Sequence, residues 1–331
     1  MQTLIRPLLI KNLSFPTNLI QGPLAGYSCW PLRLLAAEQG SVGFCYSEML
    51  SAKDLATSKK IAPRFSIKHP KEGPLCIQLS GTNPEELKKA TERALLFGAD
   101  LIDLNCGCPV SKIRQKGAGS KLLENPSLLK SLILAMKSVS SAPVSIKIRV
   151  DGQNPTPLSL TAAQMAEEAG IDFITIHGRH WTESYETPCR QDQIAQIAEK
   201  LSIPVIANGD VHDTNSALKL IQNTGAEGIM ISRACVGQPW IFNQIYHESQ
   251  GKTFLPPSKC DIGRLLLCHI EGLIELEGET SAILQSRKLF KYYGRSHLCA
   301  ETIEKAKTLR TKAQMTEHIA NSFCVDTRKV N

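Results

Sequence analysis

Two cysteines lie close together in the stretch Asp103–Ser120, which reads DLNCGCPVSKIRQKGAGS. Cys106 and Cys108 flank Gly107 just past a β-type run, and Pro109 fixes the chain direction behind them. A Cys-x-Cys pair can ligate a metal, but further thiolates or histidines at usable spacing are missing from the sequence. Both cysteines could also be small buried apolar residues. Their position alone does not say which one does chemistry.

Polar side chains end several neighbouring β-type runs. In a (β/α)8 barrel the catalytic groups lie at the carboxyl ends of the strands, and residues two apart on a strand point to the same side. Unpaired cations such as Lys147 and Arg149 are costly to bury, so their clustering predicts an anionic or electron-rich ligand. The strand-end residues, in chain order, are Gln78, Asp103, Asn105, Lys147, Arg149, His177, Arg179, Asn208 and Asp210.

The seventh and eighth β-type runs carry residues suited to a phosphate. They read IANGDV and GIMISRA, and barrels commonly bind a phosphate after these two strands. Gly209 allows the backbone to approach closely, and Arg233 can contact two phosphate oxygens with its fork of donors. We therefore expect a phosphate group at this end of the site.

Eight β-type runs alternate with helical patterns along the first 250 residues. The runs are NLIQGPLA, GFCYSEM, PLCIQLS, LIDLNC, VSIKIRV, FITIHG, PVIANGD and GIMISRA. Helices are expected between them at 84–97, 126–139, 160–169, 191–201 and 213–223. This alternation predicts an α/β fold of the (β/α)8 TIM barrel type. The alternative is an open doubly wound sheet, but no β-type run is followed by Gly-x-Gly-x-x-Gly.

A second, smaller domain is expected after the barrel. The glycine and paired prolines of residues 251–260 suit a linker, and the β pattern vanishes from Asp261 onward. Apolar residues at three- and four-residue spacing predict helices at 262–276, 281–293 and 302–323. We therefore assign 1–250 to the catalytic barrel, 251–260 to the linker and 261–331 to a small all-helical domain.

Composition narrows the class of protein. The chain has 331 residues, 42% of them apolar and 21% charged, which is ordinary for a globular protein with a sizeable core. Its net charge of +7 is compatible with a polyanionic partner. Eleven scattered cysteines without Cys-x-x-Cys argue against a disulfide framework, and no long apolar run or signal segment appears. We expect a cytoplasmic protein that uses neither a membrane nor a metal.

Several motifs together resemble one family. They are GPLAGYSCWPLR, SEM, IQLSG, LNCGCPVSKIRQKGAGSKLLENP, IKIR, TIHGR, PVIANGDV and ISRACVGQPWIF, which cover roughly 21–242, with RKLFKYY farther on. In this order they resemble the bacterial tRNA-dihydrouridine synthases, particularly the DusB-like group. The resemblance implies an FMN- and NAD(P)H-dependent oxidoreductase that reduces the C5–C6 bond of a tRNA uridine to 5,6-dihydrouridine.

The resemblance also assigns roles to residues of this chain. It implies that Cys108, directly before the proline, donates the proton, and that Cys106, at a variable position, is passive. Asn105, Arg149 and Arg179 would contact the substrate. The residues implied for FMN are Pro23, Leu24 and Ala25 along the ring, Gln78, Lys147 and His177 at its polar side, and Asn208, Gly209, Asp210, Ser232 and Arg233 toward the phosphate.

The implied chemistry fits these residue types. Flavin N5 would give hydride to uracil C6, while a general acid delivers a proton to C5 from the other side. A thiol with an ordinary pKa of about 8.5 is mostly protonated near neutral pH. Two positions depart from the family pattern: Ser232 replaces the usual glycine before Arg233, and His180 replaces a threonine.

A tRNA substrate predicts a basic surface beside the barrel mouth. Lys112, Arg114, Lys116 and Lys121 form one basic cluster. The segment 280–312 supplies a second, from which Lys288 and Lys291 are the predicted RNA contacts. The expected partners are tRNA and a nicotinamide dinucleotide, and the chain is expected to be a monomer. Two alternatives stay open: a flavin barrel acting on a small molecule, like the dihydroorotate dehydrogenases, and a catalytically idle RNA-binding relative.

Overall fold

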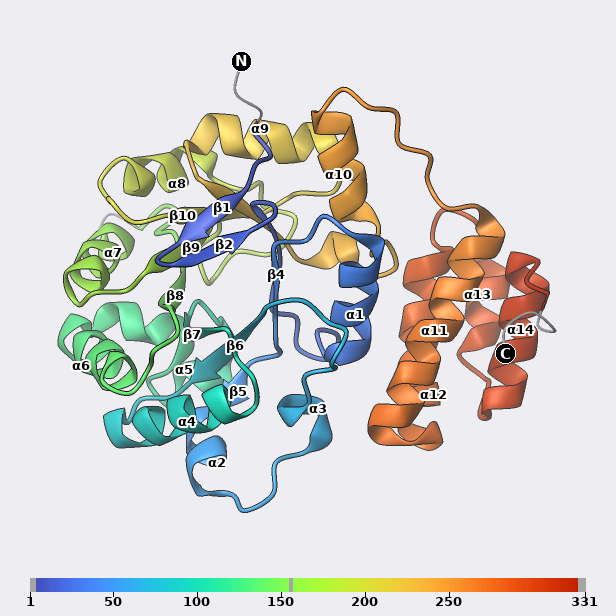
Figure 1. The fold of residues 1–331 in the computed structure, drawn as a ribbon, viewed down its shortest axis with the longest axis horizontal. Helices are drawn as coiled ribbons and strands as arrows, with labels where there is room; N and C mark the ends of the chain where they lie inside the picture. Colours follow the sequence, from blue (N-terminus) through green and yellow to red (C-terminus); the bar gives the residue numbers. More distant parts are fainter. Residues whose placement is uncertain (1–3, 155–156, 327–331) are drawn as a thin grey trace.

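The computed structural model describes residues 4–154 and 157–326, in which a bundle of helices stands beside a barrel (Figure 1). Eight parallel strands form the barrel, and pairing of β11 with β3 and of β4 with β6 closes it. The strands are β3 (Leu19–Gln21), β4 (Phe44–Tyr46), β6 (Leu75–Ser80), β7 (Leu101–Cys106), β8 (Val144–Arg149), β9 (Phe173–His177), β10 (Val205–Asn208) and β11 (Gly228–Ile231). Each lies within one of the eight predicted runs, which confirms the barrel.

An antiparallel hairpin closes the amino-terminal end of the barrel. Strand β1 (Leu8–Ile10) pairs with β2 (Leu13–Phe15), a feature that the sequence patterns did not reveal. Leu8, Ile10 and Phe15 are buried in the same apolar cluster as Phe44 and Phe173 of the barrel interior. The apolar floor leaves the carboxyl ends of the strands as the polar end of the barrel.

Helices surround the barrel and begin at the residues that the sequence favours. Asn83 caps α4 by accepting from two backbone amides, Pro84 stands at its first turn, and Asp213 and Ser216 form a capping box on α9. Around the barrel lie α1 (Trp30–Gln39), α4 (Pro84–Leu96), α6 (Pro126–Lys137), α7 (Leu158–Glu168), α8 (Gln191–Ala198), α9 (Thr214–Thr224) and α10 (Ile241–Ser249). Shorter elements are β5 (Leu50–Ser51), α2 (Ala52–Thr57), α3 (Pro63–Ser66), α5 (Ser111–Arg114), η1 (Gly119–Glu124) and η2 (Arg233–Cys235).

The carboxyl-terminal bundle contains α11 (Lys259–Glu277), α12 (Glu279–Gly294), α13 (Ala300–Ala306) and α14 (Lys312–Phe323). Helix α11 begins inside the predicted linker, because Ser258 and Asp261 form its capping box. The stretch 302–323, expected as one helical segment, is two helices, and Thr311 caps the second. The outer bounds predicted for the two domains, Met1 and Asn331, lie outside the described residues. Among the helices described, none is long and apolar enough to cross a membrane.

An ion-pair cluster joins the bundle to the barrel. Arg64 of α3 contacts Glu48, after β4, at 2.6 Å and Glu277 of α11 at 2.5 Å. All three side chains are at most 17% exposed. Pairs shielded from water in this way are costly to break from one side, so the cluster holds the bundle in a defined place against the barrel.

Candidate active site

A cavity of about 850 Å³ opens at the carboxyl ends of the barrel strands. It brings together most of the residues predicted from the sequence: Pro23, Leu24, Ala25, Gln78, Asn105, Cys108, Lys147, Arg149, His177, Arg179, Asn208, Gly209, Asp210, Ser232 and Arg233. Lys288 lies instead at a neighbouring cavity between barrel and bundle, and Lys291 is exposed on α12. Tyr27, Tyr185 and Tyr292 form an aromatic wall of the large cavity. The sequence offered Tyr292 as a residue that either stacks on bases or packs in the core, whereas Tyr27 and Tyr185 were not singled out.

The two cysteines at the end of β7, Cys106 within the strand and Cys108 just past it, face different surroundings. Cys106 is fully buried among the apolar side chains between the barrel wall and its helices, and burial raises the pKa of its thiol well above the usual value. Cys108 is half-buried and lines the cavity. Strand alternation was an available signal, because Cys106 shares its side of β7 with Leu104, whereas Asp103 and Asn105 point inward.

A chain of hydrogen bonds leads from the barrel interior to the backbone of Cys108. Gln78 Nε2 donates to Asp103 Oδ2 at 2.9 Å, and Asn105 Nδ2 donates to Gln78 Oε1 at 2.8 Å. Asn105 Oδ1 then accepts from the amide of Cys108 at 2.8 Å. Burial raises the pKa of Asp103 to about 6, while hydrogen bonds from Ser145 and Gln78 oppose that rise. The chain fixes Asn105 and thereby the start of the cysteine loop.

Lys147 places an amine in the middle of the cavity. Its Nζ donates to Asn208 Oδ1 at 3.0 Å. Burial is the main cause that lowers its pKa to about 7, with Arg149 adding to the effect and Asp103 opposing it. Burial, with Lys147 next in size, holds the pKa of His177 well below its usual value, so this imidazole is neutral at physiological pH. A ligand with negative charge near Lys147 would favour its protonated form.

Two buried arginines hold the loops that border the cavity. Arg149 Nε donates to the carbonyl of Gly107 at 2.7 Å, and its Nη1 donates to the carbonyl of His180 at 3.1 Å. Arg179 pairs with Asp210 at 2.5 Å and donates to the carbonyl of Tyr185 at 3.0 Å. Both arginines line the cavity while supporting its loops. Their predicted contacts with substrate stay predictions.

The turn after β10 has an unusual backbone conformation. Gly209 (φ 141°) is followed by Asp210 (φ 54°), a backbone conformation that side chains disfavour. A Cβ at Gly209 would lie 2.6 Å from the sulfur of Cys189. The Asp210 carboxylate is turned onto Arg179 and onto the Cys189 amide, which accounts for its unusual backbone angle. Glycine at position 209 leaves room for the side chain of Cys189, and Gly209 and Asp210 both line the cavity.

Arg233 stands beside this turn with its guanidinium half exposed. It lies 4.0 Å from the centroid of the Tyr185 ring and 3.6 Å from the carboxylate of Asp210. Ser232 fits before it because the facing residue is Gly22, where a Cβ would lie 2.4 Å from Ser232 Oγ. The hydroxyl of Ser232 is 3.4 Å from Asn208 Nδ2. The departure at Ser232 is thus accommodated by Gly22 and adds a polar group to the lining of the cavity beside Arg233.

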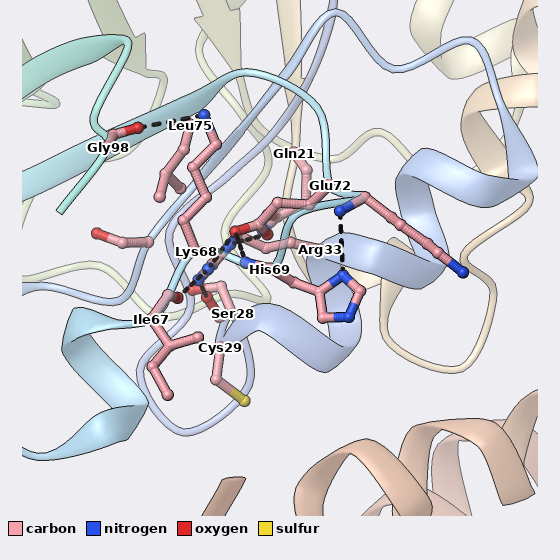
Figure 2. A network of polar contacts seen from close by, with 12 residues as sticks. Gln21, Ser28, Cys29, Arg33, Ile67, Lys68, His69, Glu72, Leu75 and Gly98 are labelled. Carbon is pink, nitrogen blue, oxygen red and sulfur yellow. Dashed lines mark hydrogen bonds and ion pairs between the residues drawn. The ribbon is translucent and has the colours of Figure 1, made fainter. Parts of the chain in front are cut away.

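A buried ion pair supports the loop after β3 (Figure 2). Arg33 of α1 pairs with Glu72 at 2.8 Å, with both side chains 2% exposed, and its Nη1 donates to the carbonyl of Ser28 at 2.8 Å. Glu72 also accepts from the amide of His69, whose ring stacks on Trp30. The pair therefore ties the loop that carries Pro23, Leu24 and Ala25 to α1.

The fold and site define a class, the TIM-barrel proteins with a polar cavity at the carboxyl ends of the strands and an appended helical bundle. A likeness in fold extends to the old yellow enzyme homologue of Zymomonas mobilis (TM-score 0.55, 12% identity, 77% of this chain and 94% of that one). Morphinone reductase in complex with tetrahydroNAD gives a TM-score of 0.55 at 14% identity, covering 78% of this chain and 93% of that one.

The family follows from the sequence itself. The dihydrouridine synthase (Dus) family model matches residues 20–327, and the chain belongs to this family. Relatives include tRNA-dihydrouridine synthase B of Yersinia pestis, 36% identical over 291 residues, and that of Escherichia coli K12, 34% identical over 289 residues. Each alignment covers 87% of this chain and 90% of the relative. The resemblance to the DusB-like group is confirmed.

Proposed function

We propose that this chain is a tRNA-dihydrouridine synthase, a flavin-dependent oxidoreductase that reduces the C5–C6 bond of a tRNA uridine. Its relatives carry that name, and its family assignment spans nearly the whole chain. One observation carries the proposal: of the two cysteines at the end of β7, Cys108 is the one that lines the cavity, in company with Lys147 and Arg149. A proton donor and two cationic side chains therefore meet at one end of a barrel.

The residues of the cavity fit FMN. Arg233 and the Gly209 turn suit its phosphate, with Asn208, Asp210 and Ser232 around them, because the exposed guanidinium of Arg233 can donate to an anion and all of these residues line the cavity. Pro23, Leu24 and Ala25 would border the ring, and Gln78, Lys147 and His177 would meet its polar side. When bound and reduced by NADPH or NADH, FMN supplies hydride from N5 to C6 of the uracil.

Residues of the chain itself would stabilise the negative charge on the flavin and donate the proton to the uracil. Lys147, with its lowered pKa, gains a proton where negative charge develops on the flavin ring, and so stabilises that charge. Cys108 transfers its S–H proton to C5, leaving a thiolate that takes a new proton from solvent. Asn105, Arg149 and Arg179 border the space for the uracil, and Asn105 holds the Cys108 amide.

The helical bundle is proposed to bind the tRNA. Lys288 and Lys291 are exposed on α12, whose far end brings Tyr292 and Arg295 to the mouth of the cavity. The next residue, Tyr293, belongs to the apolar core, since it is 1% exposed and its hydroxyl contacts His269 at 3.1 Å. The expected monomer, the cytoplasmic location and the independence from metal stay predictions. In the described residues, no group of three or more histidine, cysteine or acidic side chains could hold a metal ion.

Two measurements test the function. Purified protein should be yellow and release FMN on denaturation, which the idle-relative alternative does not predict. Pre-reduced enzyme should then be oxidised by tRNA from a strain that lacks dihydrouridine synthases, with one dihydrouridine formed per flavin oxidised, as nucleoside analysis by mass spectrometry would show. Oxidation by small molecules of the orotate type, which still carry the C5–C6 double bond, but not by tRNA would support the other alternative.

A further inference from the structure

Arg114 differs from the other basic residues of its cluster. Lys112, Lys116 and Lys121 have exposed side chains, as expected of residues that meet RNA. The side chain of Arg114 is only 12% exposed, and its guanidinium carbon lies 3.4 Å from the centroid of the Trp181 indole. This places Arg114 against the loop after β9 rather than toward solvent.

The guanidinium of Arg114 is linked to the backbone of Cys108 through one residue. Arg114 Nη1 donates to Ser120 Oγ at 2.7 Å, and Ser120 Oγ donates to the carbonyl of Cys108 at 3.1 Å. The amide of Ser120 donates to the same carbonyl at 3.1 Å. Gly119 permits this approach, because it has φ 63° and a Cβ there would lie 2.7 Å from that oxygen. Ser120 therefore holds the carbonyl of Cys108 while Asn105 holds its amide.

The two loops that border the cavity are thus joined at two levels. Arg149, at the ends of the strands, donates to Gly107 of the cysteine loop and to His180 of the loop after β9. Arg114, farther out, stacks on Trp181 of that same loop and pairs with Glu124 at 3.1 Å. A stacked arginine in a fixed hydrogen bond is more restrained than a lysine could be, because its planar fork sets both distance and direction.

We propose that Arg114 and Trp181 form a clamp that positions Cys108 for proton transfer, with Ser120 as the connection. The proposal rests on the assigned role of Cys108 as the acid. Neither clamp residue touches the reacting atoms, so both are positioning residues. A proton donor displaced by about 1 Å can lose up to a hundredfold in rate, which gives the clamp a measurable effect.

The test is single-turnover oxidation of pre-reduced enzyme by saturating tRNA. Arg114→Met and Trp181→Leu should each slow this step about tenfold or more, with a tRNA KM within about twofold of wild type, because positioning affects the reacting geometry rather than binding. Trp181→Phe, which keeps an aromatic face, should recover most of the rate. Arg114→Lys should stay slow, since it keeps the charge but loses the planar fork. FMN content and flavin reduction by the nicotinamide should be unchanged throughout.

Lys116→Met is the matched comparison, because it removes an exposed charge from the same loop and should raise the tRNA KM without slowing the saturated step. If Arg114→Met behaves like Lys116→Met, or if Arg114→Lys restores wild-type kinetics, Arg114 is an RNA contact and the clamp is refuted.

The variant Cys108→Ala separates this inference from the proposed function. If Cys108→Ala oxidises its flavin with tRNA at the wild-type rate, the assignment of Cys108 as the acid is refuted. If Cys108→Ala is slow while the Arg114 and Trp181 variants react at the wild-type rate, only the clamp is refuted.

Discussion

At the β7 end of the cavity the backbone around Cys108 is held by side chains on both sides, whereas at the β10–β11 end the guanidinium of Arg233 is half exposed. Asn105 accepts from the amide of Cys108, and Ser120 donates to its carbonyl. Arg233 has the ring of Tyr185 over it and a carboxylate 3.6 Å away. The first arrangement suits a group that must act in one direction, and the second suits one that gains its main partner when a ligand binds.

Replacing Cys108 tests the rigid end and should give the largest effect. Cys108→Ala should keep FMN and accept hydride from the nicotinamide, yet reduce uridine at least about a hundredfold more slowly, the usual contribution of a positioned acid. Cys106→Ala is the control and should stay near wild type, because that thiol faces the packed wall of the barrel. Single-turnover oxidation by tRNA measures both. If Cys106→Ala reduces uridine slowly, or if both variants react at the wild-type rate, another group must donate the proton.

Replacing Arg233 tests the open end. Arg233→Ala removes charge-assisted hydrogen bonds worth about 2 kcal/mol, so the FMN dissociation constant should rise on the order of thirtyfold. Fluorescence titration of the flavin-free protein measures it. Arg295→Ala, which removes a nearby arginine donating to Gln238, is a useful control and should change FMN affinity far less. Full retention of flavin by Arg233→Ala through extensive dialysis would mean that the phosphate lies elsewhere.

Charge reversal on α12 should affect neither end of the cavity. Changing Lys288 and Lys291 to Glu should raise the tRNA KM about tenfold and reduce its dependence on salt, because fewer counterions are released from phosphates. FMN content and the rate at saturating tRNA should not change. Reversing Lys130, an exposed lysine on α6, is the control for net charge. An unchanged KM in the α12 variant would place the RNA surface on another face.

Lys147 lies between the β7 end and the β10–β11 end of the cavity. Replacing it should give the smallest effect, which is on the stability of the folded protein. Its pKa in the folded protein, about 7, is below its ordinary 10.5, so its contribution to stability is fully present above about pH 10.5 and is lost as pH falls through 7. Lys147→Met should therefore raise the melting temperature of the flavin-free protein by a few degrees more at pH 6 than at pH 9. Calorimetry at both pH values measures this, and Lys130→Met should show no such difference. Equal gains at the two pH values would argue against a buried amine.

Local patterns predicted most of the architecture, and most of the residues predicted for the site line one cavity. The eight strands were visible because parallel barrel strands are short apolar runs, and their polar ends had to meet once the barrel closed. The amino-terminal hairpin was missed because three-residue strands give too short an alternation to recognise. The break between α13 and α14 was missed because apolar spacing continued across it, although Thr311 with Gln314 is a capping signal.

The sequence by itself determined the barrel and the family, and it predicted a set of residues most of which line one cavity. Only the tertiary structure decided which way certain side chains point. In the sequence, Arg114 is one of several cations in a basic cluster. In the structure it stacks on Trp181, a residue 67 positions away. Arg179 reads as a strand-end cation, yet it secures the carboxylate of Asp210. Such choices depend on loops that meet only when the barrel closes, because contact between distant segments is set by packing and not by local spacing.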